Sequence, residues 1–360
     1  MSIEIEEKIR LINDRIGWKL TRSLLGGEHG ITAQGLDPFI MRFTEAADGN
    51  DELSDSIDTF WDNLIFSGNR LLRIFRVQDE ELSRIHESLL GLTPDESSFN
   101  INYPSPISND ELNAADMSMH FAENRQFIIK EKQVFASVIL SKAYYTQTFE
   151  LESSHLSDAG LQLRANGGEI KCKKRMVTQC YNNIIILPAS NLVITAVDLS
   201  TLPISDAEAQ QNRLEHFIQD TTTVALRNPI NLFPAINSMY SARDGRISAV
   251  TFLTSDGNSS SLKLTPTQRC LREDSYHHGG EIASPVLTKY KLGKIWDIRY
   301  EQDRNVSIEL TLPGKRAMLD NPNKALINAV ANNSPSLGCL LLIINNLMNS
   351  LPTPEVQPED

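Results

Sequence analysis

DAGLQLRANGGEIKCKKRMVTQCYNNIIILPASNLVITAVDL, residues 158–199, predicts a series of β-strands with turns between them. Leu161 and Leu163 alternate with polar residues, which is the period of two of a half-buried strand. Asn166 and Gly167 predict a hairpin turn after it, because both residue types tolerate the positive φ that such a turn requires. A basic partner strand is expected to follow this turn.

The second half of the same stretch predicts the centre of a sheet. After a further turn, Ile184–Leu187 runs without a polar residue, as expected of a strand that is covered on both faces. Pro188 ends this strand, and residues 193–197 continue the sheet. We therefore expect an antiparallel meander with an outer, basic hairpin and a buried centre.

The part of the chain before this meander is predicted to be mainly helical. Residues 5–20 carry isoleucines at helical spacing, so one apolar stripe faces a partner while Asp14 and Arg15 face water. Apolar residues at similar spacing predict two helices over 57–65 and 71–89. The remaining expectations are a short hairpin within 31–46, an acidic loop over 45–56, and helices over 109–122 and 125–145, with strand as the alternative for 126–140.

The part after the meander mixes helices and hairpins. Ser205 and Glu208 follow Pro203 at the spacing of a capping box, which predicts a helix start. Turn signals predict one hairpin across Asp256-Gly257-Asn258 and another across 302–304. The last expectations are a helix near 321–332 and an apolar helix over 337–347.

These elements predict an α+β fold rather than a regular alternation of strands and helices. A chain of 360 residues is long for a single core, so we expect two domains. The first is an acidic, mainly helical domain at 1–156, and the second is a larger α+β domain with the basic hairpin, built on an antiparallel sheet with flanking helices, at 157–350. A polar tail at 351–360 is expected to be disordered.

The charge of the chain is unevenly distributed. The formal net charge is −12. Residues 1–156 contain 14 Lys and Arg against 26 Asp and Glu, whereas residues 157–360 contain 20 of each. Such a difference points to different partners for the two parts, and solubility is the simpler explanation of the acidic excess.

Cysteine usage and hydropathy predict a cytoplasmic protein that does not bind membranes. The four cysteines show no CxxC spacing, which favours free thiols in a reducing compartment over disulfides or a zinc site. The N-terminal sequence lacks the apolar run of a signal peptide. The longest apolar run, 339–344, is far shorter than the roughly 20 residues that span a bilayer.

Three groups of residues are candidates for chemistry. Asp158, followed by Glu169-x-Lys171, resembles the Asp and Glu-x-Lys pattern of restriction-endonuclease-like nucleases, although Glu169 directly follows the turn and its strand is not strongly apolar. The resemblance implies two carboxylates that hold Mg²⁺ beside a lysine that steadies the attacking water. His277 and His278, with Glu281, form the densest histidine group, but adjacent side chains point in different directions and make a poor chelate without a third ligand.

The third group is a basic cluster on the hairpin. Its members are Arg164, Lys171, Lys173, Lys174 and Arg175. Such a patch in an acidic protein is suited to an acidic protein surface or to phosphates, or to the acidic part of the same or a neighbouring chain.

No complete catalytic constellation, phosphate loop or nucleophile elbow is present in the sequence. The leading hypothesis is therefore a non-enzymatic binding or assembly protein that needs no cofactor. Its partner is another protein or a second copy of the chain, and nucleic acid is a secondary partner. The rival hypothesis is a Mg²⁺-dependent nuclease that uses Asp158, Glu169 and Lys171.

Overall fold

A computed structural model describes residues 5–265, 269–283, 287–300, 304–321 and 324–352. Within these ranges, the centre of the molecule is one antiparallel sheet of ten strands in the order β2-β3-β4-β5-β1-β10-β9-β8-β6-β7. The strands are β1 (Gly68–Arg76), β2 (Met119–Ile129), β3 (Lys132–Glu150), β4 (Lys171–Leu187), β5 (Leu192–Asp198), β6 (Arg246–Leu253), β7 (Ser259–Lys263), β8 (Thr288–Tyr300), β9 (Arg304–Leu312) and β10 (Ala329–Ser334).

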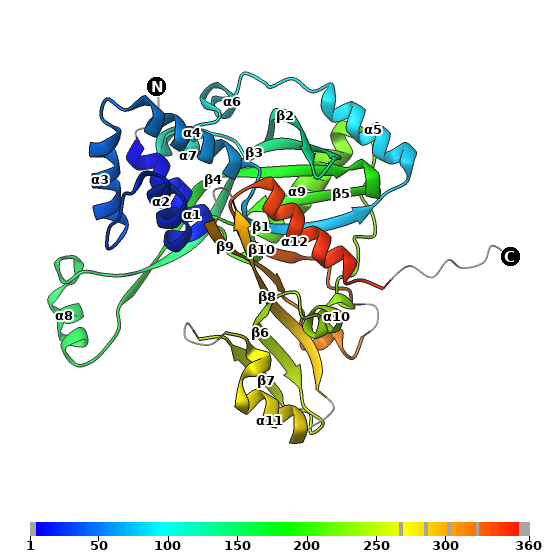
Figure 1. Cartoon of the computed structure of the whole chain (residues 1–360). Helices are drawn as coiled ribbons and strands as arrows, with labels where there is room; N and C mark the ends of the chain where they lie inside the picture. Colours follow the sequence, from blue (N-terminus) through cyan, green and yellow to red (C-terminus); the bar gives the residue numbers. More distant parts are fainter. Residues whose placement is uncertain (1–4, 266–268, 284–286, 301–303, 322–323, 353–360) are drawn as a thin grey trace.

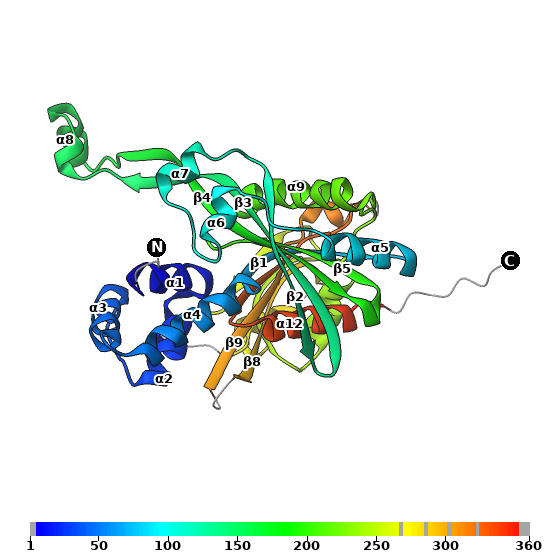
Figure 2. The same cartoon turned by 90° about the horizontal axis from the view of Figure 1, so that it is seen from above.

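Helices cover both faces of this sheet (Figures 1 and 2). The described α-helices are α1 (Ile5–Thr21), α2 (Gly27–His29), α3 (Leu36–Ala47), α4 (Asp51–Ile65), α5 (Asp79–Leu90), α6 (Ser98–Asn102), α7 (Asn109–Ala114), α8 (Asp158–Ala165), α9 (Ile204–Thr222), α10 (Ala235–Ser241), α11 (Ser275–Ala283) and α12 (Leu337–Asn349). The predicted α+β class and antiparallel sheet are confirmed.

Two apolar cores lie on opposite faces of the sheet. One joins the sheet to α1, α3, α4, α10 and α12, and the other joins it to α5 and α9. Figure 2 shows α9 and α12 on opposite sides of the strands. In β1, Leu72 and Ile74 belong to the first core, whereas Leu71 and Phe75 belong to the second. The central strands are therefore apolar on both faces, as predicted for Ile184–Leu187.

The helix predicted over residues 71–89 is wrong in its first part. Residues 68–76 form β1, at the centre of the sheet between β5 and β10, and α5 begins only at Asp79. A short run that is buried on both sides has no polar face, so its residues fit helical spacing as well as strand spacing. Tertiary burial decides between the two.

Other helices and hairpins also differ from the predictions. Residues 126–140 lie in the hairpin of β2 and β3, which confirms the strand alternative; Lys130 and Glu131 form the turn with positive φ. The predicted helix at 109–122 is limited to α7, and residues 329–332 lie in β10. The hairpin expected within 31–46 is wrong, since α3 buries Phe39 and Phe43 on one face. Part of the predicted acidic loop is the first turns of α4, which Asn50 caps by accepting a bond from Leu53 N.

Several predicted elements are confirmed. Helix α1 buries the predicted isoleucine stripe, although the chain stays helical beyond Gly26 and turns at Gly30, with φ 68°. Hairpins β6–β7 and β8–β9 and helix α12 lie where expected. Helix α9 also forms, but Pro203 rather than Ser205 occupies its N-cap, so the predicted capping box is not made.

The predicted strand at 161–164 is wrong, because these residues form α8. Ser157 caps this helix by accepting a hydrogen bond from Gly160 N at 3.4 Å. Strand β4 instead pairs with β3, from Phe135 opposite Ile186 to Glu150 opposite Lys171. The expected turn between the basic segment and Ile184 is also absent, since β4 runs continuously from Lys171 to Leu187.

The outer ends of β3 and β4 form a two-stranded arm that projects from the body and carries α8 at its tip (Figures 1 and 2). We define the arm as residues 144–177. The predicted boundary between residues 156 and 157 falls in this tip. Strands β1 to β3 precede that boundary in the sequence and β4 to β10 follow it, and all of them belong to the same sheet.

None of the described helices is both long enough and apolar enough to cross a membrane. Of the tail predicted at 351–360, residues 353–360 lie outside the described residues.

Replacing residues 147–174 by Asn-Gly should leave the fold intact. Thr146 and Arg175 are direct partners in the ladder, so a two-residue turn can join them. Residues 146–150 and 171–175 are exposed, and α8 buries no residue. The free energy of unfolding in urea should therefore change by no more than about 1 kcal/mol. A much larger loss would mean that the arm packs against the body.

Candidate functional site

One face of the arm is basic. Successive residues of a strand point to opposite faces, so Lys171, Lys173 and Arg175 share one face. Their partners on β3 are Glu150, Thr148 and Thr146, respectively. On β3, one carboxylate, Glu150, lies opposite the three cations, and Glu169 forms an ion pair with Lys171 at the outer end. All three basic residues are exposed.

An aromatic ring lies at the base of this basic face. The guanidinium carbon of Arg175 is 3.9 Å from the centre of the Tyr144 ring, and Lys142 Nζ is 5.4 Å from the same ring. Lys142 itself is buried and donates to the backbone carbonyls of Asn113, at 2.9 Å, and Ala115, at 2.6 Å. The basic face is thus joined to the body where α7 ends.

The other face of the arm is less polar. It carries Tyr145 and Phe149 from β3, and Cys172 and Met176 from β4, together with Lys174. Phe149 is 36% exposed. A two-stranded ribbon with apolar side chains in water is only marginally stable by itself. This face is therefore suited to contact with another surface.

The tip adds further apolar groups. Leu161 and Leu163 of α8 are 39% and 61% exposed. Arg164 lies on the same helix and donates to Ser153 Oγ at 3.2 Å. Of the five predicted binding residues, the structure places Lys171, Lys173, Lys174 and Arg175 along β4, whereas Arg164 lies in the tip.

The three residues of the nuclease hypothesis are arranged differently from the strand pattern that suggested it. Lys171 Nζ and Glu169 Oε2 form an exposed ion pair at 2.5 Å. Asp158 is the first residue of α8 and lies on no strand. Among the described residues, no group of three or more His, Cys, Asp and Glu side chains could hold a metal ion. Glu169 and Lys171 are brought together, and Asp158 makes no hydrogen bond or ion pair with either.

The two histidines of the second candidate point in different directions, as expected. His277 is buried in α11 and its Nε2 lies 2.8 Å from Tyr240 Oη, whereas His278 is exposed. The segment that carries both residues is helical. The side chain of Glu281 lies outside the described residues.

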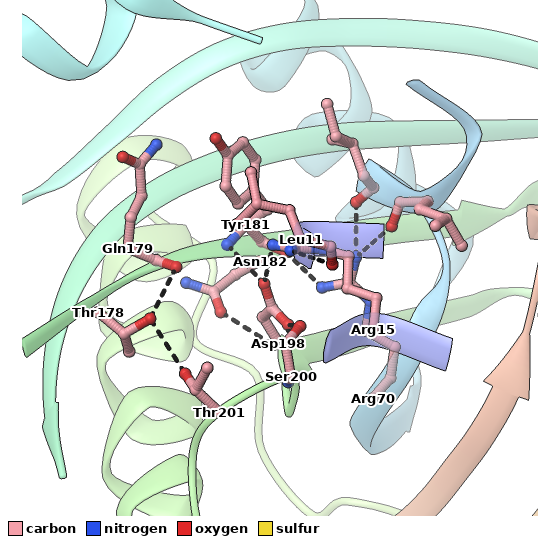
Figure 3. A network of polar contacts seen from close by, with 12 residues as sticks. Leu11, Arg15, Arg70, Thr178, Gln179, Tyr181, Asn182, Asp198, Ser200 and Thr201 are labelled. Atoms are coloured by element: carbon pink, nitrogen blue, oxygen red, sulfur yellow. Dashed lines mark hydrogen bonds and ion pairs between the residues drawn. The ribbon is translucent and has the colours of Figure 1, made fainter. Parts of the chain in front are cut away.

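A buried polar network lies where the arm joins the sheet (Figure 3). Asp198, the last residue of β5, accepts a hydrogen bond from Arg15 Nη2 at 2.8 Å and another from Tyr181 N at 3.2 Å. Ser200 N donates to the other carboxylate oxygen at 3.0 Å. Arg15 and Asp198 are each 3% exposed. The ion pair therefore connects α1 to β4 and β5 inside the protein.

Arg70 of β1 completes this network from the other side. Its guanidinium donates to the backbone carbonyls of Ser67, at 2.6 Å, and Ile65, at 2.6 Å, and to that of Tyr181. These contacts hold the end of α4 against β1 and β4. Burial lowers the pKa of Arg70 to about 10, so the guanidinium stays charged at neutral pH.

Aromatic rings cover the ion pair. The guanidinium carbon of Arg15 lies 4.5 Å from the centre of the Trp61 ring and 5.0 Å from that of Tyr181. Burial by itself would raise the pKa of Asp198, but Arg15, Arg70 and the hydrogen bonds from Ser200 outweigh it. The pKa of Asp198 therefore lies below its usual value.

Sequence reasoning missed this network. It placed Arg15 in water, whereas the side chain is buried, because α1 is covered by α4 and the sheet on more than its isoleucine stripe. Asp198 ends an apolar strand, and Arg70 directly precedes the predicted helix at 71–89. The signal available in the sequence was a charged residue directly beside an apolar run, Arg70 before one run and Asp198 after another.

A small cavity of about 150 Å³ lies beside this network, at the base of the arm. Gln179 lines it and accepts a hydrogen bond from Ile107 N at 2.9 Å through Oε1. Its Nε2 is buried without a hydrogen-bond partner among the described residues. The cavity is large enough for ordered water, which would satisfy this donor.

No protein-family model matches the sequence, and comparison with curated proteins likewise gives no match. The assignment of function therefore depends on the residues and geometry described above.

Asp198→Asn should destabilise the protein by about 3–5 kcal/mol, because it leaves Arg15 and Arg70 buried without a counter-charge. Asp37→Asn is the matched control. It removes the exposed partner of Arg10 and should cost less than about 1 kcal/mol. Urea unfolding at pH 7 measures both. Equal costs for the two variants would contradict a stabilising role for the buried charge.

The stability of the parent should also depend on pH in a defined direction. Because the folded pKa of Asp198 is depressed, its contribution is complete above the unfolded pKa, about 4, and is lost as pH falls through the folded value. The loss of stability below pH about 4 should be smaller in Asp198→Asn. Parallel pH profiles for parent and variant would show that other carboxylates dominate.

The nuclease hypothesis predicts cleavage of plasmid or oligonucleotides in the presence of Mg²⁺ or Mn²⁺. Glu169→Ala should then abolish cleavage, because one of the two carboxylates that hold the metal is lost. Glu152→Ala, a nearby exposed carboxylate, is the control. An inactive parent protein would exclude this hypothesis.

Proposed function

We propose that the protein is a non-enzymatic assembly component that uses the arm to bind an acidic surface of a partner protein. The observation that carries the proposal is the projection of a ribbon with Lys171, Lys173 and Arg175 on one face from a protein of net charge −12. These basic side chains lie away from the acidic body of the protein. They can therefore attract an acidic surface of a partner while the acidic body repels that partner less.

The second face of the arm supports a protein as the partner. Phe149, Leu161 and Leu163 are large apolar side chains at the outer part of the arm, and all three are exposed. Exposed apolar groups gathered beside polar ones are typical of protein interfaces. A protein surface can match both the cations and these apolar groups, whereas a phosphate backbone matches only the cations.

A second copy of the chain is one form that this partner can take. Residues 1–156 carry the whole acidic excess, so the arm of one copy has a complementary surface in another. We place the assembly in the cytoplasm, since none of the four cysteines forms a disulfide and Cys172 on the arm is exposed.

Reversal of Lys171, Lys173, Lys174 and Arg175 to Glu should abolish recovery of the partner in a pull-down. With a purified partner, the affinity should fall by about 100-fold or more, because four attractive contacts become repulsive. The variant should keep the parent unfolding midpoint, since all four side chains are exposed. Sedimentation velocity of the parent and the variant measures self-association and so tests whether the partner is a second copy of the chain.

A control variant reverses four exposed basic residues elsewhere. These are Lys19, Arg243, Lys263 and Lys291. It has the same net charge as the arm variant and should retain the partner. If both variants lose the partner equally, net charge alone explains the loss of binding, and the proposal is contradicted. Binding of a duplex oligonucleotide by the parent at physiological salt, lost only in the arm variant, would favour nucleic acid instead, since a two-stranded ribbon fits the major groove.

A further inference from the structure

Three arginines line one open cleft between α5 and the end of α9, away from the arm. Arg76 is the last residue of β1, Arg84 lies on α5, and Arg227 lies in the segment after α9. The cleft has a volume of about 490 Å³. Figures 1 and 2 show α5 and α9 on the same side of the sheet.

The three guanidiniums have no partner within the part of the chain that the structure describes. No hydrogen bond, ion pair or ring contact to a described residue is made by any of them, and all three residues are exposed. Arg73, three residues earlier on β1, provides a contrast: its guanidinium is buried and binds Glu215 at 2.6 Å. The charge of Arg73 is therefore neutralised by Glu215 inside the fold, whereas the charges of the three cleft arginines are not neutralised by a described residue.

The electrostatic balance of the cleft favours an anion. Its lining contains one carboxylate, Glu81, which accepts a hydrogen bond from Gln78 N at 3.3 Å at the start of α5. Three like charges that line one concave surface repel one another, and a bound anion offsets that repulsion. This arrangement occurs in a protein whose net charge is −12, where a general positive surface is not expected.

The cleft is built on rigid elements. Arg76 pairs with Leu192 of β5 in the sheet, and α5 packs against α9. Val77 and Val224 line the cleft and are buried, at 8% and 4% exposure, so they fix part of its wall in the apolar core. A site on such elements holds its charged groups in place more precisely than the arm does.

We infer that this cleft binds the phosphate groups of a small phosphorylated molecule. The planar guanidinium fork donates two parallel hydrogen bonds to phosphate oxygens, and several arginines together favour a ligand with more than one negative charge. Gln219 and Thr223, which also line the cleft, carry side chains that can donate further hydrogen bonds.

A second cleft lies on the face of the sheet that carries α10 and α12, and the two clefts share Arg76 at the end of β1. Arg76 also lines this second cleft, of about 470 Å³, together with Ile230, Pro234, Met348 and Leu351. Its lining is largely apolar. An inorganic phosphate uses only the arginine cleft, whereas an organic phosphate ester can use both.

Isothermal titration of the full chain with pyrophosphate and with ADP tests the inference. Both probes should bind with one saturable site. Arg76→Ala, Arg84→Ala and Arg227→Ala should each weaken the binding of pyrophosphate by about tenfold or more, since a charge-assisted hydrogen bond contributes about 1.5–3 kcal/mol. Arg243→Ala, an exposed arginine elsewhere, should bind both probes as the parent does.

The two probes distinguish the two kinds of ligand. ADP that binds more tightly than pyrophosphate, with the difference reduced by Met348→Glu, identifies an organic phosphate that extends into the second cleft. Equal affinities identify the phosphate groups alone as the ligand. Absence of binding by both probes at millimolar concentration would overturn the inference, as would binding that the three arginine substitutions leave unchanged.

Discussion

The buried carboxylate of Asp198 is the constraint on which the arrangement of the sheet and the N-terminal helices depends. It is held by Arg15 of α1, by Tyr181 N of β4 and by Ser200, while Arg70 approaches from β1. Two charges of one sign and one of the other are expensive to remove from water, and they are tolerated because Arg15 pairs with Asp198 while Arg70 donates to backbone carbonyls. The network therefore specifies how α1 and α4 lie on the sheet more than it adds net stability.

The arm follows from the same strands. Strand β4 runs from exposed Lys171 to buried Leu187, and Tyr181, at its middle, belongs to the network. The inner half of the strand is fixed by two cores and by the ion pair, so the outer half leaves the sheet in a defined direction. This rigid base allows a ribbon that buries almost nothing to present Lys171, Lys173 and Arg175 on one face.

Two clusters of exposed basic residues in the described part of the chain differ in physical character. On the arm, the positive charge alternates with apolar side chains on an extended ribbon, a combination that suits a large surface. In the cleft between α5 and α9, three arginines line a concave surface together with buried Val77 and Val224, a combination that suits a small anion. The net charge of −12 does not reveal either basic cluster, because the acidic residues that outweigh them are spread along residues 1–156.

The sequence by itself determined the elements whose signals are local. The isoleucine stripe of α1, the turn at Asp256-Gly257-Asn258 and the apolar α12 are each specified by neighbours in the chain, and so is the presence of the basic cluster. Only the tertiary structure decided what depends on distant partners. Residues 68–76 became a strand because β5 and β10 flank them, 161–164 became a helix because β3 took the place beside β4, and Arg15 was buried because Asp198 lies opposite. Pairing across the sheet and burial of charge are non-local free energies, and a local pattern of residue types does not contain them.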